Sequence, residues 1–457
     1  LQVVLAKQRH EEDSWPAIAR SEKPDGLLAA FDAKLPFTLT QGQSEVAKTI
    51  AAEMAAGHPM HRLLQGEVGS GKTVVAVRAM LTVVDSGGQA ALLAPTEVLA
   101  AQHYRAITTL LGPLAERGKL GAHDEGTGVT LLTGSMTTAA RRQALLDITS
   151  GQAGIVIGTH ALLEDRVDFF DLGLVVIDEQ HRFGVEQRAT LVGKAGSDRR
   201  PHVLVMTATP IPRTVAMTAF GALDISTLSE LPAGRSPITS HVVLSAEKPS
   251  HLARVWERIV EEVRAGHQAY VVVPRIASQE DKDLKPGQRQ AIALEDLAPQ
   301  LIEGPLAGVR VGIMHGQMPG PDKDEVMQRF ANGPAHKDGI DVLISTTVIE
   351  VGVDVANATT MVIMDADRFG ISQLHQLRGR VGRGRAPGLC LLVTEAPAFS
   401  PARERLAAVA STNDGFELAA LDLEQRREGD VLGRNQSGIR SSLKLVSILR
   451  DESILEQ

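Results

Sequence analysis

The chain has 457 residues, of which 43% are hydrophobic and 22% are charged, and its formal net charge is −8. One hydrophobic core rarely supports this length, so we expect a globular protein of two or three domains. No apolar run is long enough to span a membrane, and the single cysteine, Cys390, excludes an internal disulfide and suits the reducing cytoplasm. The acidic balance excludes a uniformly basic surface for nucleic acid but permits a local basic groove.

Aromatic residues are scarce, at 3% of the chain. Proteins that hold unpaired bases stack them on exposed rings. We therefore expect any grip on nucleic acid to be made mainly to the phosphate backbone. Cys390 lies in the apolar run Leu389–Val393 and is expected to be a buried small hydrophobe.

The chain begins and ends inside helical patterns. Residues 1–9 start midway through an amphipathic repeat, and residues 447–457 stop within another. We expect residues 1–35 to form a helical linker that follows a domain upstream of this chain.

An aromatic ring and a glutamine precede the first strongly apolar strand. Phe37 is followed by Gln43, which lies at the start of a predicted helix. A glutamine amide can pair with both the donor and the acceptor on the N6/N7 edge of adenine while the ring covers the base. The pair therefore predicts an adenine site, and a plain helix start is the alternative.

The stretch Gly66–Thr73 has the pattern G-x-x-x-x-G-K-T of a phosphate-binding loop. A short apolar run precedes it and an apolar helical pattern follows it, which is the context this motif requires. Backbone N–H groups and the positive end of the helix attract an anion, the lysine neutralises the β- and γ-phosphates, and the threonine hydroxyl can hold Mg²⁺. The residues expected to bind the nucleotide here are Gly66, Gly69, Ser70, Gly71, Lys72 and Thr73.

Hydroxyl side chains end three further apolar strands. The strand within Ala90–Leu99 ends at a proline, after which Thr96 is expected to cap a helix. Thr159 ends the next strand, and Thr207 and Thr209 end a later one. Hydroxyls at strand and helix ends commonly contact nucleic-acid phosphates, although simple capping explains Thr96 and Thr159 equally well. Thr207 and Thr209 are expected to act as a sensor that links the phosphate state of the nucleotide to the bound polymer. The segment Gly112–Gly128 lacks an apolar pattern and is expected to be a surface insertion.

Two carboxylates follow the apolar run Leu174–Ile177. A strand buried on both faces would deliver Asp178 and Glu179 to its carboxyl end. Asp178 is expected to hold Mg²⁺, directly or through water, and Glu179 to polarise the water that attacks the γ-phosphate. A solvated turn is the alternative for such a pair, but the phosphate loop upstream favours the catalytic interpretation.

The Pro- and Gly-rich stretch Leu231–Pro237 predicts a domain boundary. Alternation of strands and helices then starts again, which indicates a second parallel α/β domain. On a helix, Gln376, Arg380 and Arg383 would lie at i, i+4 and i+7 and share one face. Arginines on a domain without a phosphate loop suit an arginine finger, and a solvated basic face is the alternative.

These motifs, in this order, resemble those of superfamily-two helicases: Gly66–Thr73, Asp178–His181, Thr207–Thr209, Val348–Asp354 and Gln376–Arg383. More narrowly, the chain resembles the RecG family of branch-migrating DNA helicases over essentially its whole length. The stretches that carry this narrower resemblance are Leu35–Gln43, Ile177–Val185, Thr207–Thr214 and Gly433–Gly438.

The resemblance implies two tandem RecA-like parallel-sheet domains with a C-terminal segment of a helical hairpin and a loop. We expect an ATP-binding domain over residues 36–236, a second helicase domain over 237–398 and a translocation segment over 399–457. The family's N-terminal wedge domain has no counterpart in this chain, which leaves the motor but puts fork specificity in doubt.

Further site residues follow from the resemblance alone. Gly352 and Asp354 are expected to contact the nucleotide, and His181 to couple ATP hydrolysis to nucleic acid. Arg434 and Gln436 are expected to contact DNA or the first domain, although a plain helical tail with a Gly-rich turn explains this segment as well.

The implied activity is an ATP-dependent double-stranded-DNA translocase or helicase that remodels branched DNA. Holliday-junction branch migration and reversal of stalled forks, in recombination and repair, would be its tasks. The alternatives are an RNA helicase, a transcription-coupled repair translocase, or an ATP-gated binding module that is not a motor. The expected cofactors are ATP and Mg²⁺, the expected partners are branched DNA and single-stranded-DNA-binding protein, and the chain is expected to be a cytoplasmic monomer without membrane contact.

Overall fold

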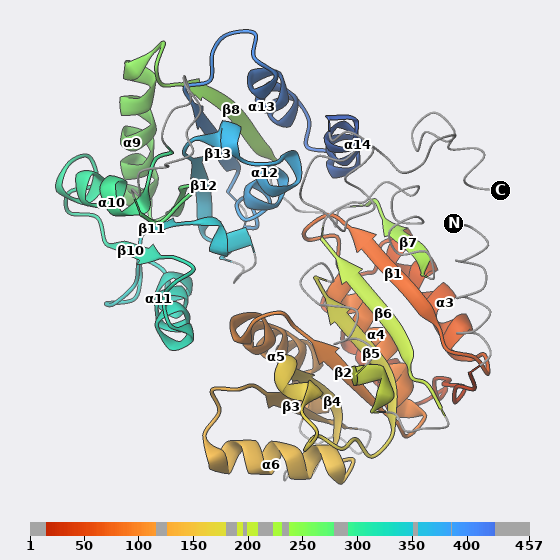
Figure 1. Ribbon diagram of the computed structural model, residues 1–457. Coiled ribbons are helices and arrows are strands. Elements are labelled where there is room, and N and C mark those ends of the chain that lie inside the picture. Colours follow the sequence, from red (N-terminus) through yellow and green to blue (C-terminus); the bar gives the residue numbers. More distant parts are fainter. Residues whose placement is uncertain are drawn as a thin grey trace. The chain divides into compact units, whose positions relative to one another are not determined.

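All the strands that the structure describes belong to two parallel sheets (Figure 1). The computed structural model describes residues 15–115, 126–179, 190–194, 199–208, 223–230, 237–277, 291–350, 355–384 and 386–425. These residues divide into two units, the first within Leu1–Pro232 and the second within Ala233–Glu428. Each unit holds one of the sheets, as the repeated alternation of strands and helices predicts.

The first sheet has the strand order β3-β4-β2-β5-β6-β1-β7. Its central strands are buried on both faces, which is why they read as continuous apolar runs. The strands are β1 (His61–Gly66), β2 (Gln89–Leu93), β3 (Gly128–Leu132), β4 (Ala153–Gly158), β5 (Leu172–Asp178), β6 (His202–Thr207) and β7 (Asp224–Leu228).

Helices of the first unit cover this sheet and contribute to its core. The helix after β1 packs against β1, β2, β4 and β5, and the one after β3 packs against β3 and β4. Short 3-10 turns lie at Gly112–Ala115 and His160–Leu163. The α-helices are α2 (Leu27–Lys34), α3 (Gln41–Met54), α4 (Lys72–Asp85), α5 (Glu97–Leu111) and α6 (Thr138–Thr149).

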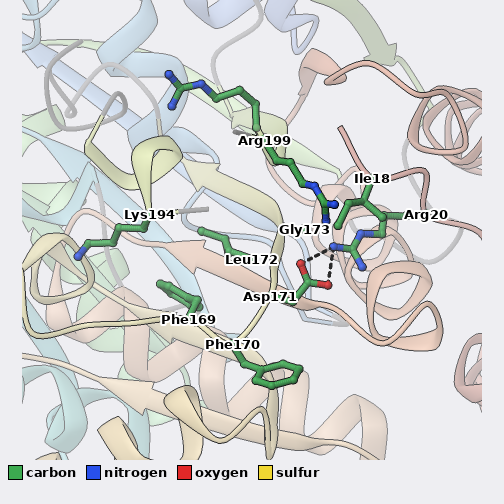
Figure 2. A pocket seen from close by; sticks show the side chains of 10 residues that line it. Ile18, Arg20, Phe169, Phe170, Asp171, Leu172, Gly173, Lys194 and Arg199 are labelled. Atoms are coloured by element: carbon green, nitrogen blue, oxygen red, sulfur yellow. Dashed lines mark hydrogen bonds and ion pairs between the residues drawn. The ribbon is translucent and has the colours of Figure 1, made fainter. Parts of the chain in front are cut away.

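The described N-terminal segment lies along the amino edge of the first sheet. Arg20, which is buried, donates both hydrogen bonds of one guanidinium nitrogen to the Asp171 carboxylate at 2.7 Å, just before β5 (Figure 2). His202, the first residue of β6, bridges Met60 and Ile18. Ile18, Arg20 and Asp171 line a cavity of about 300 Å³ at the amino ends of β5 and β6. The cavity is therefore at the opposite edge of the sheet from the phosphate loop.

The second sheet has the strand order β10-β11-β9-β12-β13-β8. Apolar side chains fill both of its faces in two separate clusters. The strands are β8 (Ile238–Leu244), β9 (Gln268–Val272), β10 (Val311–Met314), β11 (Val342–Ser345), β12 (Ala358–Ile363) and β13 (Gly388–Thr394).

Helices cover both faces of the second sheet. One cluster joins α9 (Pro249–Arg264) and α10 (Leu294–Glu303) to the strands. The other cluster includes side chains of α11, α12, α13 and α14. Their bounds are α11 (Gly320–Asn332), α12 (Ile371–Arg378), α13 (Pro401–Ser411) and α14 (Gly415–Gln425).

The apolar runs singled out in the sequence form strands, and Cys390 is buried in β13 as expected. Burial raises the pKa of its thiol to about 12. The sequence analysis did not predict three strands, β3, β7 and β8. These strands contain fewer apolar residues and are less buried than the central strands. The strands β7 and β8, and β3, lie at the sheet edges. Residues 1–14, 116–125 and 426–457 lie outside the described residues, so the predictions made for the two chain ends and for most of the insertion keep that status.

Across the described ranges, no helix combines the length and the apolar character that crossing a bilayer requires.

The buried imidazole of His202 makes stability depend on pH. Its Nδ1 accepts the Met60 N–H at 3.0 Å, so the proton lies on Nε2, which donates to the Ile18 carbonyl. Burial, with smaller contributions from Arg20 and the histidines 61 and 58, lowers the pKa of His202 from 6.5 to about 4. Below pH ~6.5 this histidine therefore binds a proton in the unfolded chain, whereas in the folded chain it binds one only below pH ~4.

We expect this difference to remove about 3 kcal/mol of unfolding free energy as the pH falls through that window. Urea unfolding of wild type and His202→Gln at several pH values measures it. The wild type should lose stability more steeply than the variant between pH ~6.5 and ~4, with parallel curves above. Curves that stay parallel throughout would contradict the assignment.

Candidate nucleotide-binding and catalytic site

The phosphate loop joins the carboxyl end of β1 to the start of α4. Gly69 and Gly71 both have φ of 85°, in the left-handed region that favours glycine. A Cβ on Gly71 would stand 2.2 Å from the Gln43 side-chain nitrogen, so a larger residue would displace that side chain. The loop therefore depends on glycine at this position for its backbone angle and for its contact with α3.

Lys72, the first residue of α4, folds back over the loop. Its Nζ donates to the carbonyl oxygens of Gly66 and Glu67, each at 2.8 Å. Ser70 is fully buried inside the turn, and Thr73 lies in the first turn of α4. Positive charge and the amino end of a helix are thus brought together where the motif places the phosphates of a nucleotide.

Gln43 ties α3 to the phosphate loop. Its Oε1 accepts the Thr40 N–H at 3.0 Å, while its Nε2 donates to the Ser70 carbonyl at 2.8 Å. Gln43 is only 3% exposed, and a primary amide has two donor hydrogens and two lone pairs, so one of each is not used by these two bonds. Phe37 is about half exposed, at 47%. The adenine contact remains a prediction. The structure adds that Gln43 also supports the phosphate loop through Ser70.

Asp178 ends β5 and Glu179 follows it in a left-handed conformation, with φ of 52°. Such a φ is uncommon for a residue other than glycine and turns the chain sharply after the strand. His103 on α5 lies against Asp178, with Nε2 at 2.7 Å from Oδ2. Nothing in the sequence pattern pointed to His103, because 75 residues separate it from Asp178.

Opposing effects act on the ionisation of Asp178. Burial alone would raise the pKa of its carboxyl. The hydrogen bond with His103, electrostatic attraction to His103 and Lys72, and the N–H of Glu179 outweigh burial and hold the pKa below its ordinary value. The carboxylate is therefore charged at neutral pH, as a ligand of a divalent cation must be.

The hydroxyl residues lie at the same edge of the first sheet as the phosphate loop, since all strands run parallel. Thr207 ends β6, the strand between β5 and β1. Thr96 caps α5 and its Oγ1 accepts the Leu99 N–H, as predicted for a capping residue. Thr159 follows β4 but is only 1% exposed, so its hydroxyl is not presented to the surface in this conformation.

The shared helix face predicted for Gln376, Arg380 and Arg383 is wrong. The helix α12 ends at Arg378, and Gly379 is its C-cap. Arg380 continues as a turn, its N–H bonded to the Leu377 carbonyl, and Gly382 then reverses the chain with φ of 68°. Arg383 donates from Nε to the Gly379 carbonyl at 2.9 Å. The two arginines therefore belong to a glycine-bounded turn that follows the helix carrying Gln376.

Arg378, which sequence analysis passed over, is the structural arginine of this region. It is 2% exposed, and its Nη1 donates to the carbonyls of Val409 and Thr412, both at 2.7 Å. Its Nη2 contacts His375 Nδ1 at 2.8 Å. These bonds fasten the end of α12 to the end of α13 and so hold the start of the turn with Arg380 and Arg383.

Six predicted site residues lie outside the described residues: His181, Thr209, Gly352, Asp354, Arg434 and Gln436.

Among the described residues, no group of three or more His, Cys, Asp or Glu side chains is arranged to hold a metal. A Mg²⁺ ion that travels with a nucleotide needs only one or two carboxylates, because phosphates and water complete its shell. Asp178, kept ionised near the loop that carries Thr73, fits that sparse set of ligands.

Three family models match successive parts of the chain. Residues 40–218 match the DEAD/DEAH box helicase family, and residues 251–385 match the helicase conserved C-terminal domain. Residues 412–457 match ATP-dependent DNA helicase RecG, domain 3, C-terminal.

Curated relatives and solved structures agree with these matches. The chain is 56% identical over 455 residues to ATP-dependent DNA helicase RecG of Mycobacterium bovis, covering 100% of this chain and 61% of that protein. It is 44% identical to the RecG of Bacillus subtilis, covering 94% of this chain and 58% of that one. A solved RecG bound to a three-way DNA junction is 36% identical with a TM-score of 0.76, covering 100% of this chain and 55% of that one.

The fold alone is shared with more distant proteins. Dbp5 of Saccharomyces cerevisiae, solved with RNA and ADP BeF3, has a TM-score of 0.58 at 17% identity and covers 90% of this chain and 98% of that one.

Because the Gln43 side chain bonds to both Thr40 and Ser70, replacing it should have a measurable effect on nucleotide binding. In Gln43→Ala, the loop loses its bond from Ser70 to α3 and adenine loses its partner, so the Kd for a fluorescent ATP analogue should rise. If adenine is read by this amide, the preference for ATP over GTP should also fall, by roughly the 10-fold or more that one or two lost hydrogen bonds imply. Gln41→Ala, on the exposed side of the same helix, is the matched control. A lower affinity with unchanged preference would leave Gln43 as a support of the loop only.

Proposed function

This chain belongs to the RecG family of ATP-dependent DNA helicases, and on that basis we propose that it is the motor of a double-stranded-DNA translocase that remodels branched DNA. The chain spans about three fifths of the length of the curated relatives it matches, at 61% of the mycobacterial protein. The activity and partners of the whole protein are therefore part of the proposal.

The observation that carries the proposal is the convergence at the edge of the first sheet. Lys72 follows β1, Asp178 ends β5 and Glu179 comes directly after it, and only β6 lies between these two strands. Lys72 is close enough to Asp178 to lower the pKa of its carboxyl. A cation and an ionised carboxylate beside a loop of converging N–H groups are the elements that phosphoryl transfer to water needs.

Each residue has a distinct task in this chemistry. Lys72 and the loop N–H groups bind and orient the β- and γ-phosphates, and Thr73 and Asp178 would hold Mg²⁺. When bound, that ion neutralises charge that develops on the phosphate oxygens. Glu179 orients the attacking water and accepts its proton. Its left-handed backbone fixes the direction in which the carboxylate leaves the strand.

The second unit would complete the site by supplying positive charge. Arg380 and Arg383 follow α12 on a turn that Arg378 braces. We assign to them the arginine-finger role, in which a guanidinium stabilises transition-state charge. Gln376, on α12, would contact the same nucleotide, together with Gly352 and Asp354.

Movement along DNA would require an element beyond the two sheets. In our division, residues 36–236 and 237–398 are the two helicase domains, and 399–457 is the translocation segment. Its described part consists of α13 and α14, which pack on α12, the helix that precedes the arginine turn. Arg434 and Gln436 would transmit changes at that turn to the DNA backbone.

The partner we propose is branched double-stranded DNA, as the junction bound by the solved relative suggests. Thr96, Thr207 and the neighbouring strand ends would contact phosphates at the same edge of the sheet as the nucleotide. We further propose that the protein acts as a monomer in the cytoplasm and meets single-stranded-DNA-binding protein at forks.

Displacement of a third strand from a triplex tests the proposed function. The chain should release that strand in an ATP-dependent manner and show ATPase stimulated by duplex DNA more than by single strands or RNA. Lys72→Ala and Glu179→Gln should each reduce turnover by roughly 10²-fold or more, while Glu179→Gln still binds ATP. Stimulation by RNA alone would point to an RNA helicase, and ATPase without displacement would point to a binding module; either result refutes the proposal.

The arginine turn yields a separate prediction. Arg383→Ala should lower kcat by roughly 10³-fold while the KM for ATP changes little, because a finger acts on the transition state. Arg264→Ala, an exposed arginine of the same unit, is the control and should leave kcat unchanged. A variant that weakens ATP binding and keeps its turnover would remove the finger role from Arg383.

A further inference from the structure

A helix that lies outside the catalytic motifs holds the catalytic carboxylate. His103 projects from α5, and its Nε2 lies 2.7 Å from Oδ2 of Asp178. Both side chains are largely buried, at 13% and 15% exposed. Because a carboxylate oxygen only accepts, the imidazole must donate its proton here. The contact is a charge-assisted hydrogen bond, which is shorter and stronger than one between neutral groups.

This bond restricts how Asp178 can meet a cation. His103 holds one carboxylate oxygen, Oδ2, and the N–H of Glu179 also bonds to this carboxylate, so its orientation toward a cation is restricted. Carboxylates that bind metals are commonly held by such hydrogen-bonding neighbours, whose loss typically costs roughly 10- to 100-fold in metal affinity or activity. Among the described residues, the hydrogen bond of the His103 side chain is the one to Asp178, so its effect on the site passes through that carboxylate.

The same helix begins at a residue that faces the predicted DNA-binding edge. Thr96 caps α5, and His103 follows it by seven residues, so the two lie on one face about 10 Å apart along the axis. Glu97, in the first turn, accepts the Ser135 N–H at 3.1 Å and thereby joins α5 to the loop after β3. A displacement of this first turn would move the rigid helix and hence the donor that holds Asp178.

We propose that His103 is a positioning residue that orients the Asp178 carboxylate for Mg²⁺–nucleotide and makes that orientation depend on contacts at the first turn of α5. The inference rests on the proposed function in one respect, because the contact at that turn is DNA phosphate at Thr96. Occupancy of the DNA edge is thereby transmitted to the catalytic carboxylate within the first unit itself.

Two nearly isosteric substitutions separate the donated bond from simple packing. His103→Gln keeps an N–H donor at a similar reach, whereas His103→Met fills the space without a donor, and both residues favour helix. Thr109→Ala, at an exposed position of the same helix, is the matched control. A thermal unfolding measurement on each variant establishes that it is folded.

The first readout is the Mg²⁺ requirement for binding a fluorescent ADP analogue, which needs no turnover. The half-saturating Mg²⁺ concentration should rise roughly 10-fold or more in His103→Met. In His103→Gln most of that loss should be recovered, and Thr109→Ala should match wild type. Equal Mg²⁺ requirements in wild type and His103→Met, or equal losses in the Gln and Met variants, would overturn the positioning role.

The second readout is the ratio of ATPase rates with and without duplex DNA at saturating Mg²⁺ and ATP. This ratio should fall toward one in His103→Met and stay near the wild-type value in His103→Gln. A raised Mg²⁺ requirement with full DNA stimulation would overturn the transmission through α5. If wild-type ATPase does not respond to DNA, the proposed function fails, and the Mg²⁺ titration still decides whether His103 positions Asp178.

Discussion

The buried carboxylate of Asp178 is held in its ionised form by groups from several parts of the first unit. Burial would by itself favour the protonated form, in which the group is a poor ligand for a divalent cation. Lys72 from β1–α4, His103 from α5 and the N–H of Glu179 each favour the charged form. These groups come from three separate parts of the chain and meet because every strand of the first sheet ends at the same edge.

The phosphate loop is held by a side chain of the neighbouring helix α3. Gly71 takes a left-handed conformation that also makes room for the Gln43 amide, which bonds to the Ser70 carbonyl and to the amino end of α3. Adenine, if it is read by the same amide, would meet a group already aligned by two bonds. Binding a nucleotide would then cost little additional side-chain entropy, because the rotamer of Gln43 is set before the base arrives.

In the second unit, Arg380 and Arg383 lie on a turn and not on the face of a helix. Gly379 ends α12 and Gly382 reverses the backbone, so Arg380 and Arg383 leave the helix that the spacing predicted for them. Arg378 is buried instead and binds the end of α13. A change in the packing of α13 and α14 on α12 would consequently act on the base of the arginine turn.

The sequence by itself determined the two parallel sheets, the phosphate loop and the end of β5 that carries Asp178 and Glu179. Apolar runs and motif spacing are local properties, so one stretch of chain suffices to read them. The tertiary structure alone decided that His103 holds Asp178 across 75 residues, that Arg20 pairs with Asp171 across 151, and that Asp85 caps α2 through the N–H groups of Leu27 and Leu28. Such pairs depend on which strands become neighbours, and neither the order of strands nor the direction of a side chain at a helix end is written in the local pattern. The predicted helix face for Arg380 and Arg383 was wrong for a related reason, since α12 ends at Arg378 with Gly379 as its C-cap, before either arginine is reached.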